Sequence, residues 1–278
     1  MVRRHARPGQ QPVLAIDDLR VRFRRRRGVV TAVDGVTLEV HPGEIVGVIG
    51  ESGSGKSMTA FSVMRLLPKT ADLSGSIRLD GQELTALPEA AMRDVRGNRI
   101  ALIPQDALQS LNPTLRVGFQ VGEPIALHRR GTGAGLRGRV LDLMRAVGMA
   151  RPEQTVRAWP HQLSGGMQQR AMIATGLALE PRLIIADEQT TALDVTVQAG
   201  ILDLLRAIRD RSGAGMMFIT HDLGVVAELC DYVYVMNGGR VVEHGPVEQV
   251  LTAPAEDYTR MLLAATPSLD APLAEVGT

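Results

Sequence analysis

The sequence contains a glycine-rich loop directly after a short apolar run. The run reads Glu44-Ile45-Val46-Gly47-Val48-Ile49, and the loop reads Gly50-Glu51-Ser52-Gly53-Ser54-Gly55-Lys56-Ser57. The apolar run predicts a strand, and the helical periodicity of residues 58–67, which Pro68 stops, predicts a helix after the loop. The loop therefore matches the GxxxxGK[ST] pattern in the place that its mechanism requires, between a strand and a helix.

This loop has the chemistry of a phosphate cradle. Its glycines let successive backbone N–H groups point inward around phosphate oxygens, and the dipole of the following helix adds positive potential there. We expect Lys56 to reach the β- and γ-phosphates and the Ser57 hydroxyl to bind Mg²⁺. A glycine-rich turn without a ligand is the less favoured interpretation, because strand and helix flank the loop. The predicted nucleotide contacts in this segment are Gly50, Ser52, Gly53, Ser54, Gly55, Lys56, Ser57 and Met58. The loop alone does not separate a GTPase, a kinase and a transporter ATPase.

Composition restricts the class of protein. With 278 residues, 45% hydrophobic and 22% charged, the chain can bury a substantial core, which excludes a disordered protein. A formal net charge of +1 gives no general attraction to nucleic acid or anionic lipid. The single cysteine, Cys230, excludes an intrachain disulfide and a multi-cysteine metal site, and it fits a reducing compartment.

No part of the sequence predicts a membrane span. No run approaches the roughly 20 consecutive apolar residues that cross a bilayer. The basic start, Met1–Pro8, is not followed by the apolar region of a secretion signal. We expect a soluble chain whose membrane role comes through a partner.

Strand and helix patterns alternate along most of the chain. Residues 13–22 and 29–40 alternate apolar and polar side chains and predict an antiparallel β layer with a charged turn at Arg24–Arg27. Further strands are predicted at 76–79, 100–103, 183–186, 216–220 and 232–236, and helices at 195–211 and 223–229. This alternation is typical of a parallel sheet that helices cover on both faces.

The middle of the chain has a different pattern. From about 118 to 179 there is little strand signal, whereas 140–147 and 167–179 have helical periodicity. The predicted fold is α/β: a P-loop NTPase (RecA-like) core with an N-terminal antiparallel β layer and an inserted α-helical subdomain, about 106–179. We expect one composite domain over 13–265 and a C-terminal tail over 266–278.

A second apolar run ends in two carboxylates. Leu183-Ile184-Ile185-Ala186-Asp187-Glu188 has the Walker B arrangement, in which a buried strand carries acidic groups to the carboxyl edge of the sheet. There Asp187 can hold Mg²⁺, directly or through water, and Glu188 can act as general base on the attacking water. Solvated carboxylates at a strand end are the ordinary alternative for an isolated pair.

A third segment completes a recognisable order of motifs. Leu163-Ser164-Gly165-Gly166-Met167-Gln168-Gln169-Arg170 predicts a helix start with Ser164 as N-cap and glycines that allow close approach to an anion. By itself this is an ordinary cap. Following the phosphate loop at this distance, it resembles the signature motif of the ABC ATPase family, and the resemblance extends over about 13–265.

The resemblance implies further site residues. Gln105 would be the Q-loop glutamine that contacts Mg²⁺ and ATP, Asp194 would lie in the D-loop, and His221 would be the catalytic switch histidine. Phe23 would stack on adenine. Taken alone, His221 would be read as packed or solvated and Phe23 as core. In this family Ser164, Gly165 and Gly166 grip an ATP that the P-loop of a second ATPase subunit holds, so the implied cofactors are ATP and Mg²⁺.

Three strings resemble the dipeptide, oligopeptide and nickel importer branch: Ser110–Thr114, Thr190–Gln198 and Tyr258–Arg260. The branch implies peptide uptake, with nickel or another small solute as the alternative. It also implies partners: transmembrane permease subunits, a second ABC ATPase subunit (a paralogue or an identical chain) and an extracytoplasmic substrate-binding protein. The expected location is the cytoplasmic face of the cell membrane, as a peripheral subunit.

The chain also departs from the family pattern. Gln189 replaces a usual proline and Pro104 a common aromatic, but neither change removes a phosphate or metal ligand. Many members of the branch continue into a cysteine-containing motif linked to an iron–sulfur cluster, and with one cysteine no such cluster is predicted.

Other classes remain open on sequence alone. A nucleic-acid- or ribosome-associated ABC protein could use the Arg24–Arg27 run, but such a run more often forms a solvated turn, so no nucleic-acid partner is predicted. A small-molecule kinase would need no signature helix. ATPase activity that depends on a second subunit would separate a transporter from a kinase, and salt-sensitive nucleic-acid binding would support the other class.

Overall fold

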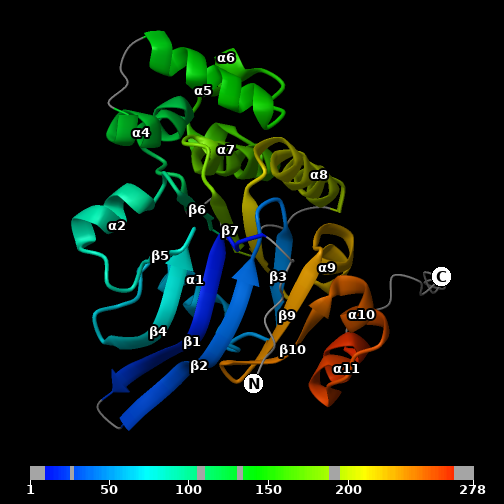
Figure 1. Cartoon of the computed structure of the whole chain (residues 1–278). Helices are drawn as coiled ribbons and strands as arrows, with labels where there is room; N and C mark the ends of the chain where they lie inside the picture. Colours follow the sequence, from blue (N-terminus) through cyan, green and yellow to red (C-terminus); the bar gives the residue numbers. More distant parts are fainter. Residues whose placement is uncertain (1–9, 26–27, 105–109, 130–133, 188–194, 266–278) are drawn as a thin grey trace, which may run out of the picture.

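The computed structural model describes residues 10–25, 28–104, 110–129, 134–187 and 195–265. Two sheets form its framework (Figure 1). The four-stranded sheet is antiparallel, with the order β2-β1-β4-β5. Its strands are Leu14–Arg25 (β1), Gly28–Val40 (β2), Ala71–Leu79 (β4) and Gln82–Glu83 (β5).

The six-stranded sheet has the order β10-β9-β3-β8-β7-β6. Its strands are Ile45–Ile49 (β3), Ile100–Ile103 (β6), Leu183–Asp187 (β7), Gly215–Ile219 (β8), Tyr232–Asn237 (β9) and Arg240–Pro246 (β10). All neighbours pair in parallel except β10, which is antiparallel to β9. Every residue of β3, β7 and β8 is buried, as expected for central strands with both faces covered.

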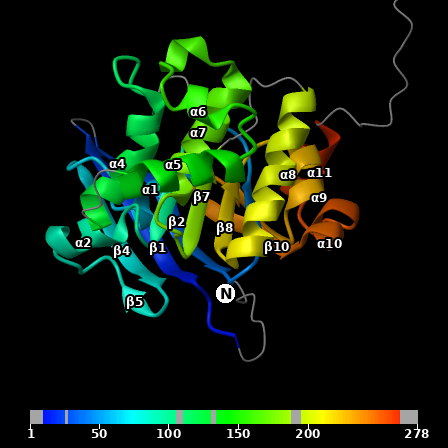
Figure 2. The same cartoon turned by 90° about the horizontal axis from the view of Figure 1, so that it is seen from above.

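Helices surround this sheet and gather beyond one end of it. They are Lys56–Val63 (α1), Glu89–Val95 (α2), Val117–Arg129 (α4), Ala134–Ala146 (α5), Pro152–Thr155 (α6), Gly165–Leu177 (α7), Val195–Ser212 (α8), Leu223–Leu229 (α9), Val247–Thr252 (α10) and Asp257–Ala264 (α11). Helices α4–α7 lie together at the end opposite the β1–β2 ribbon (Figure 1). Seen from above, α8, α9 and α10 follow one another along one side (Figure 2).

The predicted strands and helices are present, with shifted ends. The helix after the loop ends at Val63 rather than Leu67. Arg65 adopts a left-handed conformation with φ 50° while its N–H bonds to the Ser62 carbonyl, so the chain leaves the helix before Pro68. The strand predicted at 76–79 begins earlier, at Ala71, because it pairs along most of β1.

Several elements were not predicted. Helix α4 contains Pro124, which argues against a helix in a sequence pattern, yet Val117, Val121 and Ile125 bury one face of it. Strand β10, the short β5, and helices α2, α10 and α11 were also missed. Helices α4–α7 lie between β6 and β7 in the chain, where the sequence predicts an insertion, and the exact domain bounds remain a prediction.

None of the helices in the described ranges is long and apolar enough to cross a membrane.

Candidate nucleotide site

The sheet brings the two predicted phosphate and metal segments to one edge. Strands β3, β8 and β7 are parallel neighbours, and Ile219 of β8 lies opposite both Val48 of β3 and Asp187 of β7. The glycine-rich loop therefore leaves β3 two strands away from the Asp187 carboxylate. Ligands of open α/β sheets bind outside the carboxyl ends of the strands, and this is that edge.

Glycine is required at two positions of the loop. Gly50 has φ 142°, and a Cβ there would lie 2.1 Å from the Met236 carbonyl oxygen. Gly55 has φ 103°, and a Cβ there would lie 2.6 Å from the Ala32 carbonyl oxygen. Both positions thus combine a backbone conformation that L side chains rarely adopt with a close backbone neighbour.

Lys56 folds back onto the loop that precedes it. Its ammonium donates to the Gly50 carbonyl at 2.6 Å and to the Glu51 carbonyl at 2.8 Å. The Ser54 hydroxyl lies 3.5 Å away, and Lys56 is only 5% exposed. A buried ammonium held by backbone oxygens gives the loop a fixed positive charge.

Helix α1 begins at Lys56 without a side-chain cap. Its first-turn N–H groups have no partner further back in the helix, and they add to the positive potential at the loop. Ser57 and Met58 lie in this first turn and are partly exposed. Ser57 Oγ and the carboxylate of Asp187, which is 8% exposed, are oxygen donors of the kind that Mg²⁺ prefers.

Two elements outside the loop contact it, and sequence reasoning assigned neither contact. The N–H of Gly239, in the turn between β9 and β10, donates to the Ser54 carbonyl at 3.0 Å. The hydroxyl of Tyr258, on α11, accepts from the Glu51 N–H at 3.2 Å. Tyr258 belongs to one of the strings that mark the importer branch, which was the only available signal.

His221 follows β8 at the same edge of the sheet. It is exposed, whereas the preceding Thr220 is buried and donates its N–H to the Val48 carbonyl at 3.3 Å. Asp222 caps α9 by accepting from the Gly224 and Val225 amides. His221 is therefore presented to solvent at a position that the sheet and the helix cap define.

The signature segment lies at the start of α7. Ser164 is the N-cap, and its hydroxyl accepts from the Met167 N–H at 3.4 Å. Ser164 and Gly165 are exposed, and Gly166 is partly exposed. The buried Gln168 donates to the Pro160 and Leu163 carbonyls and so supports the turn beneath them. This helix start is open to a ligand from outside the chain.

Phe23 lies on β1, opposite Val30 and Ala71. It is partly buried and packs against the main core cluster, so within this chain its contacts are those of a core residue, and its predicted stacking on adenine stays a prediction.

Gln105, Glu188 and Asp194 lie outside the described residues, and their predicted roles stay predictions. Within the described ranges, no group of three or more His, Cys, Asp or Glu side chains is arranged to hold a metal.

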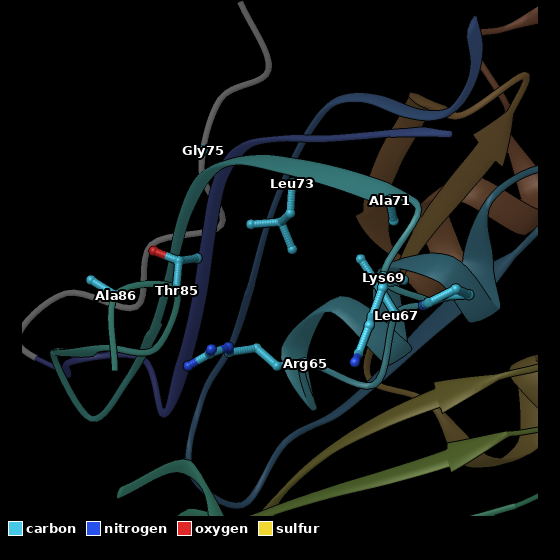
Figure 3. A pocket seen from close by; sticks show the side chains of 9 residues that line it. Arg65, Leu67, Lys69, Ala71, Leu73, Gly75, Thr85 and Ala86 are labelled. Carbon is cyan, nitrogen blue, oxygen red and sulfur yellow. The ribbon is translucent and has the colours of Figure 1, made fainter. Parts of the chain in front are cut away.

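A hollow of about 470 Å³ lies past the far end of α1 (Figure 3). Arg65, Lys69 and Thr85 are among the residues that line it. The Arg65 guanidinium already donates to the Leu84 and Leu87 carbonyls. Because the glycine-rich loop lies at the opposite end of α1, this hollow is not part of the loop's site.

Residues 33–191 match the family profile described as ABC transporter. The chain belongs to this family. Among curated relatives, the probable peptide ABC transporter ATP-binding protein y4tR of Sinorhizobium fredii is 46% identical over 96% of this chain and 80% of its own length. The peptidoglycan transport ATP-binding protein YejF of Agrobacterium fabrum is 51% identical over 94% of this chain, which spans only 48% of that relative.

Solved ABC cassettes have the same fold. A dimeric ATP-binding cassette in a post-hydrolysis state, bound to ADP and Pi, aligns with a TM-score of 0.75 and 27% identity over 84% of this chain and 98% of that one. The cassette cbiO1 from Clostridium perfringens, part of an ABC transporter complex, aligns with a TM-score of 0.74 and 26% identity over 88% of this chain and 92% of that one. The predicted α/β fold class, with its antiparallel layer, is confirmed for this ABC ATPase.

Proposed function

We propose that this chain is the ATP-binding and ATP-hydrolysing subunit of an importer that takes up peptides through partner permease subunits. The observation that carries the proposal is the row Val48–Ile219–Asp187, which sets the glycine-rich loop and an acidic strand end at one sheet edge. A nucleotide's phosphates and their cation need a cradle of donors and an oxygen ligand side by side, and this edge offers both.

The residues divide the chemistry between them. Lys56 and the loop N–H groups bind the phosphates, and Ser57, Asp187 and Gln105 hold Mg²⁺, which when bound neutralises phosphate charge. Glu188 takes a proton from the attacking water, and the exposed His221 contacts the γ-phosphate. Phe23 stacks on the adenine. The roles of Lys56, Ser57, Asp187 and His221 are assigned on the motif order together with the positions described above, and those of Gln105, Glu188 and Phe23 on the motif order alone.

Hydrolysis in this proposal needs two ATPase subunits. Ser164, Gly165 and Gly166 are presented outward at a helix start, and we assign them to the ATP that the opposing subunit holds, beside Asp194 of the D-loop. A solved cassette with this fold is described as dimeric and bound to ADP and Pi. The second subunit is an identical chain or a paralogue.

Peptides are the favoured cargo because the relatives' names point to them. They include peptide and oligopeptide transport ATP-binding proteins at 46% and 48% identity. The peptidoglycan transport relative widens the class to peptides linked to cell-wall sugars. Permease subunits in the membrane, an extracytoplasmic substrate-binding protein and a site on the cytoplasmic face complete the proposal. Nickel or another small solute is the alternative cargo.

The test is reconstitution with the membrane proteins that co-purify with the full chain. In vesicles that contain this complex and the binding protein, we expect uptake of a labelled tripeptide that requires ATP on the side of this chain. Labelled nickel serves as the competing cargo in matched vesicles. ATP-dependent nickel uptake without peptide uptake would select the alternative. ATP hydrolysis that is unaffected by the permeases would refute the coupling.

A further inference from the structure

We infer that Tyr258 is a positioning residue for the phosphate loop: its hydroxyl fixes the peptide unit that holds Lys56. The inference rests on the proposed function, because it assumes that residues 50–57 bind ATP. It gives a role to the Tyr258–Arg260 string, which no proposed catalytic step uses.

Tyr258 and Lys56 bind the two ends of one peptide. The Gly50 carbonyl accepts from the Lys56 ammonium at 2.6 Å, and the Glu51 N–H donates to the Tyr258 hydroxyl at 3.2 Å. These two groups belong to the trans peptide that joins Gly50 to Glu51, and in a trans peptide C=O and N–H point in opposite directions. The Lys56 ammonium and the Tyr258 hydroxyl therefore lie at opposite edges of one peptide plane, and together they set its rotation.

The arrangement also couples the two hydrogen bonds electrostatically. A peptide that donates through its N–H becomes a stronger acceptor at its carbonyl, so bonds in a chain reinforce one another. The Tyr258 contact thus strengthens the hydrogen bond that the Lys56 ammonium donates to the Gly50 carbonyl oxygen. It also directs the Glu51 N–H away from the loop interior, where phosphate oxygens are expected.

Hydrogen bonds fix the start of helix α11 to the sheet, so the helix can hold Tyr258 in a constant position relative to the loop. Arg260 donates to the Pro254 and Ala255 carbonyls at 2.7 and 3.0 Å, which closes the turn before the helix. Glu243 of β10 accepts from the Ala255 amide at 2.7 Å and so ties the same turn to the sheet. The position of the Tyr258 backbone is therefore set by the sheet that also carries the loop.

The ring of Tyr258 is seated next to the strand that leads into the loop. Tyr258 and Leu262 pack against a buried cluster that includes Ile49, the residue directly before Gly50. Helices α10 and α11 lie beside β9 and β10 (Figure 1). The ring contributes packing and the hydroxyl contributes direction, and replacing tyrosine by phenylalanine separates the two contributions.

The test is Tyr258→Phe in the full chain, with Mg-ATP binding measured by calorimetry and turnover measured over a range of ATP concentrations. Loss of one hydrogen bond between neutral groups predicts that Kd and KM for ATP rise about three- to tenfold. The value of kcat at saturating ATP should stay within about twofold, because bound ATP restores the loop. Tyr232→Phe is the matched control, because its lost hydroxyl bonds to His244 and its nucleotide affinity should equal that of the wild type.

Amide hydrogen exchange provides a readout that does not depend on nucleotide binding. In the nucleotide-free wild type, the Glu51 amide should exchange more slowly than that of the exposed Gly53, and Tyr258→Phe should remove the difference. If the wild type binds Mg-ATP but Tyr258→Phe binds it equally well, or if the Glu51 amide is unprotected in the wild type, the inference is overturned. A wild type that does not bind Mg-ATP refutes the proposed function instead.

Discussion

Lys56 shows how much of the site depends on single residues. Its ammonium is almost fully buried and is held by carbonyl oxygens of its own loop, which leaves a positive charge positioned before any phosphate arrives. Charge buried in this way is costly unless it serves a ligand or is well paired. The lysine therefore supplies the charge of the loop, while Gly50 and Gly55 set the path of its backbone.

Lys56→Ala should abolish ATP binding or hydrolysis, because it removes the positive charge that contacts the phosphates. The fold should be retained, because the loop's conformation depends mainly on its backbone and glycines. ATP titration by calorimetry and a thermal melt followed by circular dichroism measure the two parts separately. Wild-type turnover in this variant would show that the nucleotide site lies elsewhere.

Glu188→Gln should retain ATP binding and nearly stop hydrolysis, because an amide cannot take the proton of the attacking water. Loss of a general base typically lowers the rate about 10²- to 10⁴-fold, which phosphate release from pre-bound ATP can measure. Should the rate stay within about tenfold of the wild type, another group is the base.

The sequence predicts the residues of the loop better than their partners. Gly50, Lys56 and Asp187 could be named because the pattern that identifies each of them spans a few consecutive positions. The contact of Tyr258 with Glu51 joins positions 207 residues apart, and Gly239 reaches Ser54 across most of the chain. No local pattern encodes such contacts, so only the folded chain reveals them.

The signature helix α7 carries the clearest prediction at the scale of elements. A Cβ on Gly166 would lie 2.7 Å from Val197 of α8, so a substitution there disturbs packing as well as charge. Ser164 is exposed, and both Asp and Asn are good N-caps, so it can be changed without loss of the helix start.

Ser164→Asp should leave ATP affinity of the isolated chain unchanged and prevent ATP-driven dimerisation in the Glu188→Gln background. The reason is that a carboxylate would face the γ-phosphate across a desolvated interface. Ser164→Asn is the neutral control and should still dimerise, as judged by light scattering after gel filtration. An ATP-locked dimer of the aspartate variant would contradict a trans-acting signature.

Strand β5 gives a prediction about acid stability. Glu83 accepts from the Ser76 hydroxyl at 2.5 Å and from the Thr85 hydroxyl at 2.7 Å. Partial burial alone would raise its pKa, but these bonds and two backbone amides lower it from 4.5 to about 2. A carboxylate with a depressed folded-state pKa stabilises the fold above its unfolded-state value and loses this contribution as pH falls.

Wild-type melting temperature should therefore fall between about pH 4.5 and about pH 2 partly because Glu83 becomes protonated. Glu83→Gln should lower the melting temperature at pH 7 and flatten its decline over that window, while Glu248→Gln, at an exposed position, should leave the decline unchanged. Parallel melting curves for the wild type and Glu83→Gln across this range would rule out the contribution.

Tertiary packing explains why some elements could not be predicted. In α4, Val117, Val121 and Ile125 recur at the four-residue spacing of a helix, but Pro124 between them argues against one. Only the packed structure shows that burial of this face outweighs the proline. By contrast, β3, β7 and β8 are short apolar runs with turn residues around them, and they appear where expected.

For the whole molecule, the proposed site is complete only when two ATPase subunits meet. Specific ATPase activity should therefore rise with the concentration of the chain, or with that of a paralogous partner at fixed chain concentration, until the dimer is saturated. Initial rates across a dilution series measure this. Specific activity that is independent of both concentrations would mean that one subunit hydrolyses ATP unaided.

The row Val48–Ile219–Asp187 also acts as a molecular ruler. Adjacent strands lie about 4.8 Å apart, so two steps across β8 set a span of about 10 Å between the loop strand and the acidic strand. Peptide hydrogen bonds fix this span, and side-chain volume does not. Substitution of one apolar residue by another in these buried strands should therefore leave the distance between β3 and β7 unchanged.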